Sequence, residues 1–513
     1  MTVGVIEQPT LSPSPKASRR EWIGLAVIAL PCLLYSMDLT VLNLAVPAIS
    51  ADLEPSSTQL LWILDIYGFL VASSLITMGT LGDRIGRRRL LLIGAAVFGV
   101  TSVIAAFSTS AEMLIVTRAL LGLAGATLAP STLSLIRNMF LDPAQRTFAI
   151  GVWVTSYSVG GALGPILGGL VLEHFWWGSA FLIGVPVMLL LLLVGPVLLP
   201  EFRDPNARRL DLLSAALSLV SVLLVIYGLK RMAAGGLSWL SILSVIVGTV
   251  VGIAFVRRQR RLDDPFLDLR LFHSPAFSAS LVAYTLATFI MFGSYIFIAQ
   301  YLQLVLGLSP LEAGLWTVPL MCAYIAGSML VPTLARRFQP AWLMSGGLVI
   351  SGLGFILLAR LGDTPSLTLL LIASVVYSLG MSPVVILATD LIVGSAPVER
   401  AGAASALSET SSELGGALGI AVLGSIGVMT YRSGLLSGLP AGIPPLAAEA
   451  AQSTLGAAIA EAATLRGPAG AELLATARAA FSHSFEVIAL ISAAIAFATA
   501  VMTARLLRGV KQG

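Results

Sequence analysis

The chain has 513 residues, of which 57% are hydrophobic and only 11% are charged. Soluble globular proteins carry about 25% charged residues, so this composition excludes a protein whose main solvent is water. The net charge of +4 would suggest an anionic partner in a soluble protein, but membrane topology explains it better here.

A polar tail rich in proline and serine, residues 1–21, opens the chain, and no cleavable signal peptide is predicted. Apolar stretches of about 20 residues then recur along nearly the whole length. Backbone groups in lipid must be hydrogen-bonded internally, so each stretch is predicted to be a transmembrane helix of an all-α polytopic membrane protein. The fourteen expected spans are 22–48, 58–80, 89–108, 111–135, 147–171, 178–199, 211–230, 237–257, 275–304, 311–334, 341–360, 366–390, 401–429 and 484–507.

The first two spans each contain a carboxylate, Asp38 and Asp65. A charge at bilayer depth costs roughly 2.5–3.5 kcal/mol on insertion scales, so such residues are usually functional. At about 1.5 Å per residue, both acids and Arg118 of the fourth span lie at similar depth, in the outer half of the bilayer. We expect both acids to handle protons or a cationic substrate. The alternatives are a structural Asp38 bonded across helices and an Asp65 neutralised by Arg118.

The turn after the second span combines glycines with charges: Gly82, Asp83, Arg84, Gly86, Arg87 and Arg88. Glycines permit a tight turn, and the charges can form pairs with a neighbouring helix end, which predicts a cytoplasmic gating loop. The fifth span carries a row of small residues and one proline: Gly151, Gly160, Gly164, Pro165, Gly168 and Gly169. Such a face allows two helices to approach closely, and the proline bends one of them.

The chain repeats itself in one register. Thr80–Arg84 matches Thr333–Arg337 and Pro130 matches Pro383, both 253 residues apart. Further matches at nearly the same offset are Arg146 with Arg400 and the Gly160–Gly164 segment with Gly415–Gly419. Two parallel six-helix repeats follow. The predicted domains are the tail at 1–21, a bundle at 22–199, two inserted helices with linkers at 200–274, a second bundle at 275–507 and a tail at 508–513.

Near the end of the chain, the thirteenth span contains Glu409 and Glu413, which share one helix face because they are four residues apart. We expect them to bind protons or a cation, unless they simply face a wet vestibule. Asp390, at the inner end of the twelfth span, is interpreted as an interfacial residue. Residues 430–483 form a long outer loop, either a hairpin or a mobile segment. Of the 30 basic residues, 23 fall on one side of the membrane, which places both termini in the cytoplasm.

Several of these segments resemble the major facilitator superfamily. Gly79–Arg89 is similar to its signature loop, and the fifth span has the spacing of the antiporter motif of drug:proton antiporters. Asp38–Pro47 and Ser408–Gly416 resemble segments of the fourteen-helix branch, which includes quaternary-ammonium and multidrug exporters. One departure is Leu121, where the family usually has glutamine. The resemblance implies two six-helix bundles plus two inserted helices.

Together these features predict a proton-coupled multidrug efflux antiporter rather than an enzyme. Its cargo would be hydrophobic cations such as dyes and quaternary ammonium compounds, and Arg118 would be the charge partner of its acids within the membrane. We expect no cofactor and no metal, a proton gradient as energy source, no nucleic-acid partner, a monomer, and a cytoplasmic (inner) membrane location. The alternatives are a dedicated exporter of one endogenous compound, such as an antibiotic or a lipid, and a membrane protein without transport function.

Overall fold

The computed structural model describes residues 15–55, 57–203, 211–235, 238–262, 265, 267, 269–308, 310–362, 366–397, 401–440, 443–452, 454–465 and 468–510. Some side chains within the helices lie outside the described set, including those of Asp65 and Pro165. The first group of helices comprises α1 (Arg19–Leu53), α2 (Ser57–Ile85), α3 (Arg87–Ala106), α4 (Ala111–Gly125), α5 (Leu128–Met139), α6 (Pro143–His174), α7 (Ser179–Leu182) and α8 (Gly184–Leu198).

A hairpin of two helices follows, α9 (Leu212–Gly235) and α10 (Trp239–Gln259). The last group comprises η1 (Leu269–His273), α11 (Pro275–Gln300), η2 (Tyr301–Val305), α12 (Pro310–Ala335), α13 (Pro340–Ala359), η3 (Arg360–Gly362), α14 (Leu367–Gly394), α15 (Ala401–Gly438), α16 (Pro445–Ala451), α17 (Leu455–Thr464) and α18 (Pro468–Leu506). Each of the fourteen expected spans falls on these helices. Thirteen stretches of the described residues are long and apolar enough to cross a membrane. The fifth expected span is not among these thirteen, but it lies on α6, a helix of 32 residues. The predicted all-α membrane fold is confirmed.

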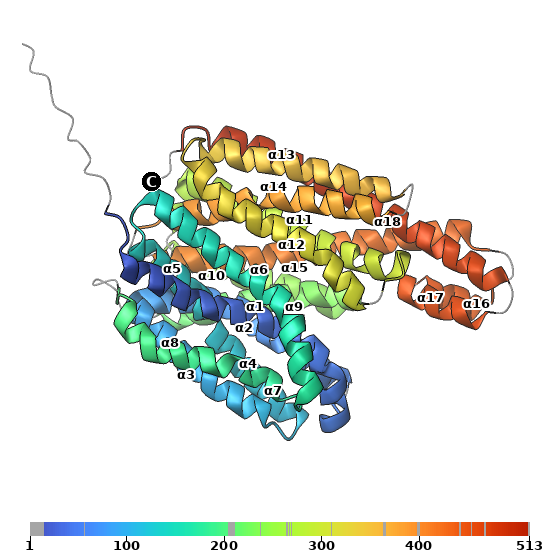
Figure 1. The fold of residues 1–513 in the computed structure, drawn as a ribbon, viewed down its shortest axis with the longest axis horizontal. Coiled ribbons are helices and arrows are strands. Elements are labelled where there is room, and N and C mark those ends of the chain that lie inside the picture. The colour runs from blue at the N-terminus through green and yellow to red at the C-terminus, as the bar shows by residue number, and fades with distance from the viewer. Residues whose placement is uncertain are drawn as a thin grey trace, which may run out of the picture.

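The two groups of helices pack in the same way. In the first, α1 runs along α6 and α3 along α8; in the last, α11 runs along α15 and α13 along α18. The groups meet where α2 packs against α15 and α6 against α12 (Figure 1). The inserted helix α9 contacts both α2 and α15, one helix from each group. Tyr227 of α9 stacks on Trp62 of α2, with ring centroids 6.2 Å apart.

Local sequence signals set the helix starts that matter for the site. Ser18 caps α1 in a capping box, in which Glu21 accepts the Ser18 amide at 2.7 Å. Asp142 caps α6 by accepting the amide of Gln145 at 2.9 Å, and Pro143 occupies the first helical position. Gly86 separates α2 from α3 with a φ of +111°, a conformation that favours glycine.

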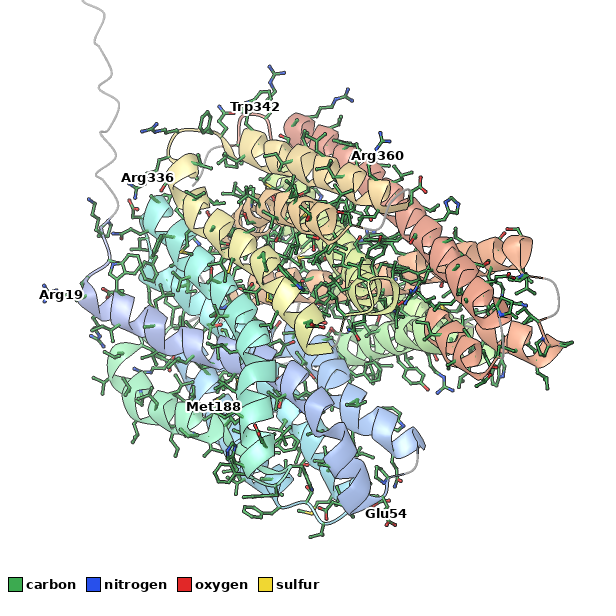
Figure 2. All side chains as sticks on the ribbon, turned by 45° about the vertical axis from the view of Figure 1, so that its right-hand side comes forward. Arg19, Glu54, Met188, Arg336, Trp342 and Arg360 are labelled. Atoms are coloured by element: carbon green, nitrogen blue, oxygen red, sulfur yellow. The ribbon has the colours of Figure 1, made fainter. Side chains whose placement is uncertain are left out.

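One end of the molecule carries the start of α1 and the end of α18, and we call it the terminal end (Figure 1). Figure 2 places Arg19 and Arg336 at this end and Glu54 at the opposite end, which we call the far end. The segment predicted as a long outer loop, 430–483, lies at the far end and is largely helical. Tyr431 donates to the Ala451 carbonyl at 2.9 Å, which ties α15 to α16.

Two spans are therefore longer than hydropathy indicates: α15 extends to Gly438, and α18 begins at Pro468 rather than near 484. The added turns of α18 are rich in alanine, the strongest helix former. A helix does not need to end where the lipid ends, so hydropathy alone underestimates its length.

Candidate functional site: paired acids and the contacts between the bundles

Arg118 of α4 lies against Asp38 of α1. Its Nη1 is 2.6 Å from Asp38 Oδ2, and its Nε donates to the Ile63 carbonyl at 3.3 Å. The guanidinium also sits 4.6 Å from the ring centroid of Tyr67, and its side chain is 1% exposed. An ion pair this deeply buried is stable only when its hydrogen-bonding groups find partners. The structure thus pairs the predicted membrane arginine with Asp38, and the Asp65 side chain lies outside the described residues.

Glu413 of α15 reaches across to the other bundle. Its Oε1 accepts a hydrogen bond from the hydroxyl of Tyr35 of α1 at 3.3 Å. One helical turn earlier, Glu409 is mostly buried, and its Oε1 has no hydrogen-bond partner among the described residues. An unpartnered carboxylate oxygen in a buried position is costly, and such groups in native structures usually have a functional reason.

Aromatic rings connect these two groups of charges. Tyr67, which lies under Arg118, is 6.0 Å from the ring of Tyr35, and Tyr35 in turn bonds Glu413. Tyr157 of α6 packs edge-on against Tyr35, with centroids 5.7 Å apart. A continuous chain of contacts therefore runs from the Asp38–Arg118 pair to Glu413 of α15. Rings of this kind can also stack on a flat organic cation.

At the terminal end, Asp83 of the predicted gating loop binds the start of α15. Its carboxylate oxygens accept the backbone amides of Gly402 at 3.0 Å and Ala403 at 2.9 Å. These amides belong to the first turn of α15, where they have no partner within the helix and carry the positive end of the helix dipole. Arg87, fully buried, donates to Asp83 at 2.9 Å and holds it in place. This contact joins the two bundles.

Two other residues of the predicted loop, Gly82 and Arg88, contact helices of their own bundle. Arg88 donates to the carbonyls of Pro196 and Leu199, each at 3.0 Å, and so ties α3 to the end of α8. Gly82 packs closely on α3, where a Cβ would lie 3.2 Å from Leu90. Arg84 lies in the last turn of α2.

A second contact between the bundles corrects the interpretation of Asp390 as an interfacial residue. Its side chain is 2% exposed, and Oδ1 is 2.6 Å from Nε of Arg146 on α6. The hydroxyl of Thr147 donates to Oδ2 at 2.9 Å. The internal repeat contained a signal for a charge contact at Asp390. Asp390 follows Arg137 by 253 residues, the same offset that relates Pro130 to Pro383. A position that is basic in the first repeat is therefore acidic in the second.

The predicted antiporter motif lies along α6 and serves more than one contact. A Cβ at Gly160 would collide with the carbonyl of Leu33, and one at Gly168 would lie 2.9 Å from Val41, so both glycines allow α1 to approach. Gly151 instead faces α12, with the Ser328 carbonyl 3.3 Å from its Cβ position. Gly164 is buried, Gly169 meets nothing within 4 Å, and the ring of Pro165 lies outside the described side chains.

Two substitutions test whether the glycine at position 160 is needed for the close packing of α1 on α6. Gly160→Ala is expected to lower the melting temperature and the free energy of unfolding by about 1–3 kcal/mol, because the methyl group forces α1 away from α6. Gly169→Ala is the matched control and should unfold like the parent. Thermal unfolding of both purified variants tests this, and equal melting temperatures would contradict the assigned contact.

Residues 28–420 match the family described as the Major Facilitator Superfamily. The chain belongs to the major facilitator superfamily. It is therefore a multi-pass membrane transporter and not an enzyme, as the sequence predicted. Two transporters of known structure share the fold: the human organic anion transporter MFSD10 (TETRAN) has a TM-score of 0.61 at 17% identity, covering 93% of this chain and 100% of that one. A bacterial homologue of the lysosomal transporter Spinster has a TM-score of 0.56 at 20% identity, covering 96% and 99%.

Several relatives are similar along most of the chain. The multidrug efflux pump LfrA of Mycolicibacterium smegmatis is 45% identical over 483 residues, covering 94% of this chain and 95% of its own. The methyl viologen resistance protein SmvA of Salmonella typhimurium is 35% identical, with coverages of 91% and 94%. The tetracenomycin C resistance and export protein of Streptomyces glaucescens is 34% identical, with coverages of 80% and 77%.

Proposed function

We propose that this protein is a proton-coupled antiporter that exports hydrophobic, mainly cationic drugs, dyes and quaternary ammonium compounds. The names of relatives that align along more than nine-tenths of the chain, a multidrug efflux pump and a methyl viologen resistance protein, support drug export. Methyl viologen is a flat organic dication, which suits acids beside aromatic rings. The proposed location is the cytoplasmic membrane with both termini inside, in agreement with the distribution of basic residues.

The observation that carries this proposal is the position of Glu409 and Glu413 at the boundary between the bundles. Glu413 bonds Tyr35 of the opposite bundle, and Glu409 has a buried oxygen without a partner among the described residues. A carboxyl group in such a place binds either a proton or a cation, and each drives off the other. Asp38 and Asp65 are proposed to share this role, with Arg118 as the charge partner. Inward proton flow supplies the energy, about 2.3 kcal/mol per charge per 100 mV of membrane potential, and no cofactor is required.

Alternating access follows from the proposed architecture. The two bundles rock about the acids, and the contacts of Asp83 with α15 and of Arg146 with Asp390 close the terminal end in one state. The glycines and Pro165 of α6 form the proposed hinge. The monomer is the proposed working unit.

Transport in proteoliposomes tests the proposal. With a pH gradient imposed, the parent should move ethidium, and a protonophore should stop it. We expect Glu409→Gln and Glu413→Gln, as well as Asp38→Asn and Asp65→Asn, to slow transport about tenfold or more, because an amide can neither take up and release a proton nor carry the negative charge that holds a cation. Glu472→Gln, an exposed acid of α18, is the matched control. Parent-like transport by all four variants contradicts the assignment of the acids.

The second candidate is a dedicated exporter of one endogenous compound, favoured by the similarity to the tetracenomycin C export protein. The names of the two relatives refer to different compounds, methyl viologen and tetracenomycin C, so a transport assay must distinguish the two candidates. A neutral cargo would make export insensitive to Asp38→Asn. Gradient-driven flux of a neutral antibiotic but not of ethidium would favour this candidate.

A further inference from the structure

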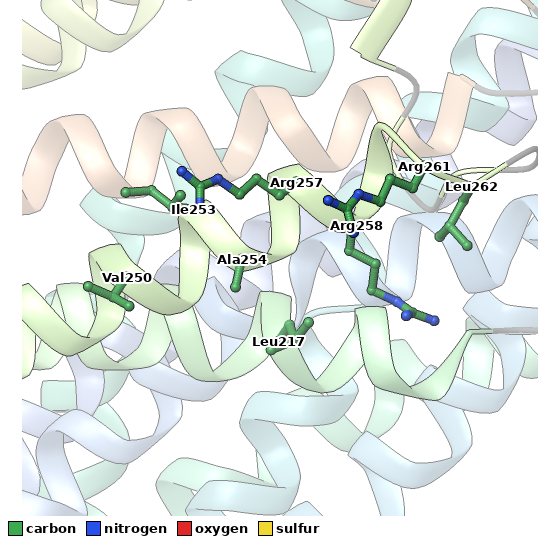
Figure 3. Close-up of a pocket in the computed structure, with 8 residues that line it drawn as sticks. All are labelled: Leu217, Val250, Ile253, Ala254, Arg257, Arg258, Arg261 and Leu262. Atoms are coloured by element: carbon green, nitrogen blue, oxygen red, sulfur yellow. The ribbon is translucent and has the colours of Figure 1, made fainter.

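The inserted hairpin carries a groove at the terminal end that the transport cycle described above does not use. It has a volume of about 690 Å³ and is formed by α9, by α10 and by Arg261 and Leu262, which lie just beyond the end of α10 (Figure 3). Its apolar part consists of Leu217 on α9 with Val250, Ile253 and Ala254 on α10. Its other part is basic, with Arg257, Arg258 and Arg261.

The order of these residues along α10 gives the groove one apolar end and one positively charged end. Val250, Ala254, Arg257 and Arg261 follow one another at steps of three or four residues, so they share one side of the helix. Val250 and Arg261 are eleven residues apart, a rise of about 16 Å. Val250 and Ile253 are 59% and 48% exposed, so the apolar part is open to the surrounding lipid rather than packed against protein.

Two of the three arginines are available for a ligand. Arg258 is bound by Asp211, whose Oδ2 is 2.8 Å from Nη2 and 3.0 Å from Nε. Although burial alone would raise the pKa of Asp211, hydrogen bonds from Ser214 and Arg258 outweigh it and lower this pKa, which keeps Asp211 ionised beside Arg258. Arg257 and Arg261 are exposed, and neither forms an ion pair with a carboxylate among the residues that the structure describes.

We propose that this groove binds an anionic phospholipid of the adjacent leaflet. The phosphate lies between Arg257 and Arg261, and an acyl chain covers Val250, Ile253 and Ala254. The ligand must be anionic because Arg257 and Arg261, which have no carboxylate partner in the described part of the chain, repel a cationic drug. It must carry a long apolar tail because the rest of the groove is apolar. Basic pockets beside transmembrane helices on the cytoplasmic side are known to hold such headgroups. This inference does not depend on the proposed cargo.

Native mass spectrometry of the delipidated full-length protein, titrated with dioleoyl-phosphatidylglycerol, tests the proposal. Arg257→Ala/Arg261→Ala is expected to weaken binding roughly tenfold to thirtyfold, because each arginine near a membrane surface contributes about 1 kcal/mol. Arg260→Ala is the matched control: it is exposed in the same segment, it does not line the groove, and it should bind within about twofold of the parent. Ala254→Trp fills the apolar part and should also weaken binding while the arginines remain.

Two further binding measurements identify the ligand. Dioleoyl-phosphatidylcholine, which has no net charge, should bind at least about tenfold more weakly than the anionic lipid. Glycerol phosphate, which has the headgroup charge but no tails, should not compete at equal concentration. Three results overturn the proposal. If Arg260→Ala weakens lipid binding as much as the double variant does, binding depends on general surface charge. If phosphatidylcholine binds equally well, the groove recognises only the apolar tails, and if glycerol phosphate competes, the site binds phosphate alone.

Discussion

Arg118→Leu is expected to lower the free energy of unfolding by about 3–5 kcal/mol and to abolish transport. The substitution leaves the half-buried carboxylate of Asp38 without the fully buried guanidinium that lies 2.6 Å from it, and breaking a buried ion pair by removing one partner costs about this much. It also removes the cation that packs on Tyr67, and with it the link toward Tyr35 and Glu413. Unfolding in detergent with increasing dodecyl sulfate, followed by intrinsic fluorescence, measures the loss.

A double variant separates stability from function. Asp38→Leu/Arg118→Leu removes both charges, and replacing a buried ion pair with apolar residues is often neutral or stabilising. We therefore expect it to regain most of the stability but to remain inactive in the ethidium assay. Arg432→Leu, an exposed arginine of α15, is the control and should change neither property. If Arg118→Leu unfolds like the parent, the pair does not hold α1 and α4 together.

Asp390→Asn is expected to open the terminal end. With the bundles in contact, the buried Arg146 would lose the carboxylate of Asp390 that lies 2.6 Å from it; separation of the bundles returns its guanidinium to water. The closed arrangement therefore loses about 3–5 kcal/mol relative to the open one, which is close to the 5.5 kcal/mol that inverts a 99:1 population. The asparagine can still accept a bond from Thr147, so the fold of α14 itself is kept.

Spin labels at Arg19 and Arg336, exposed at the terminal end on different bundles, report this opening (Figure 2). The labels are attached in a background in which the exposed cysteine, Cys322, is replaced by serine. The distances between them, measured by double electron–electron resonance, should be short in the parent and predominantly longer in Asp390→Asn. The exchanged pair Arg146→Asp/Asp390→Arg should restore the short distance. An unchanged distance distribution in Asp390→Asn would show that this ion pair does not keep the end closed.

Much of the fold was predictable from the sequence because hydropathy and glycine spacing act locally. The spans, the similar packing of α1 on α6 and α11 on α15, and the close approach at Gly160 follow from patterns a few residues long. The identification of the acids was also local, because a carboxylate among apolar residues is conspicuous wherever it lies. The same reasoning placed Arg118 at the depth of Asp38 and Asp65, but it did not show which of the two acids pairs with the arginine.

The partners of the charges depended on tertiary structure. Only the packing of α1 against its neighbours brings Arg118 to Asp38, and only the contact between bundles brings Tyr35 to Glu413 and Arg146 to Asp390. Asp390 looked interfacial because its depth along α14 was known but the helix that faces it was not. The sequence by itself determined which segments cross the membrane and which of them carry charge. The tertiary structure decided which charges meet, because an ion pair depends on how two distant helices are rotated toward each other, and no pattern within one helix contains that angle.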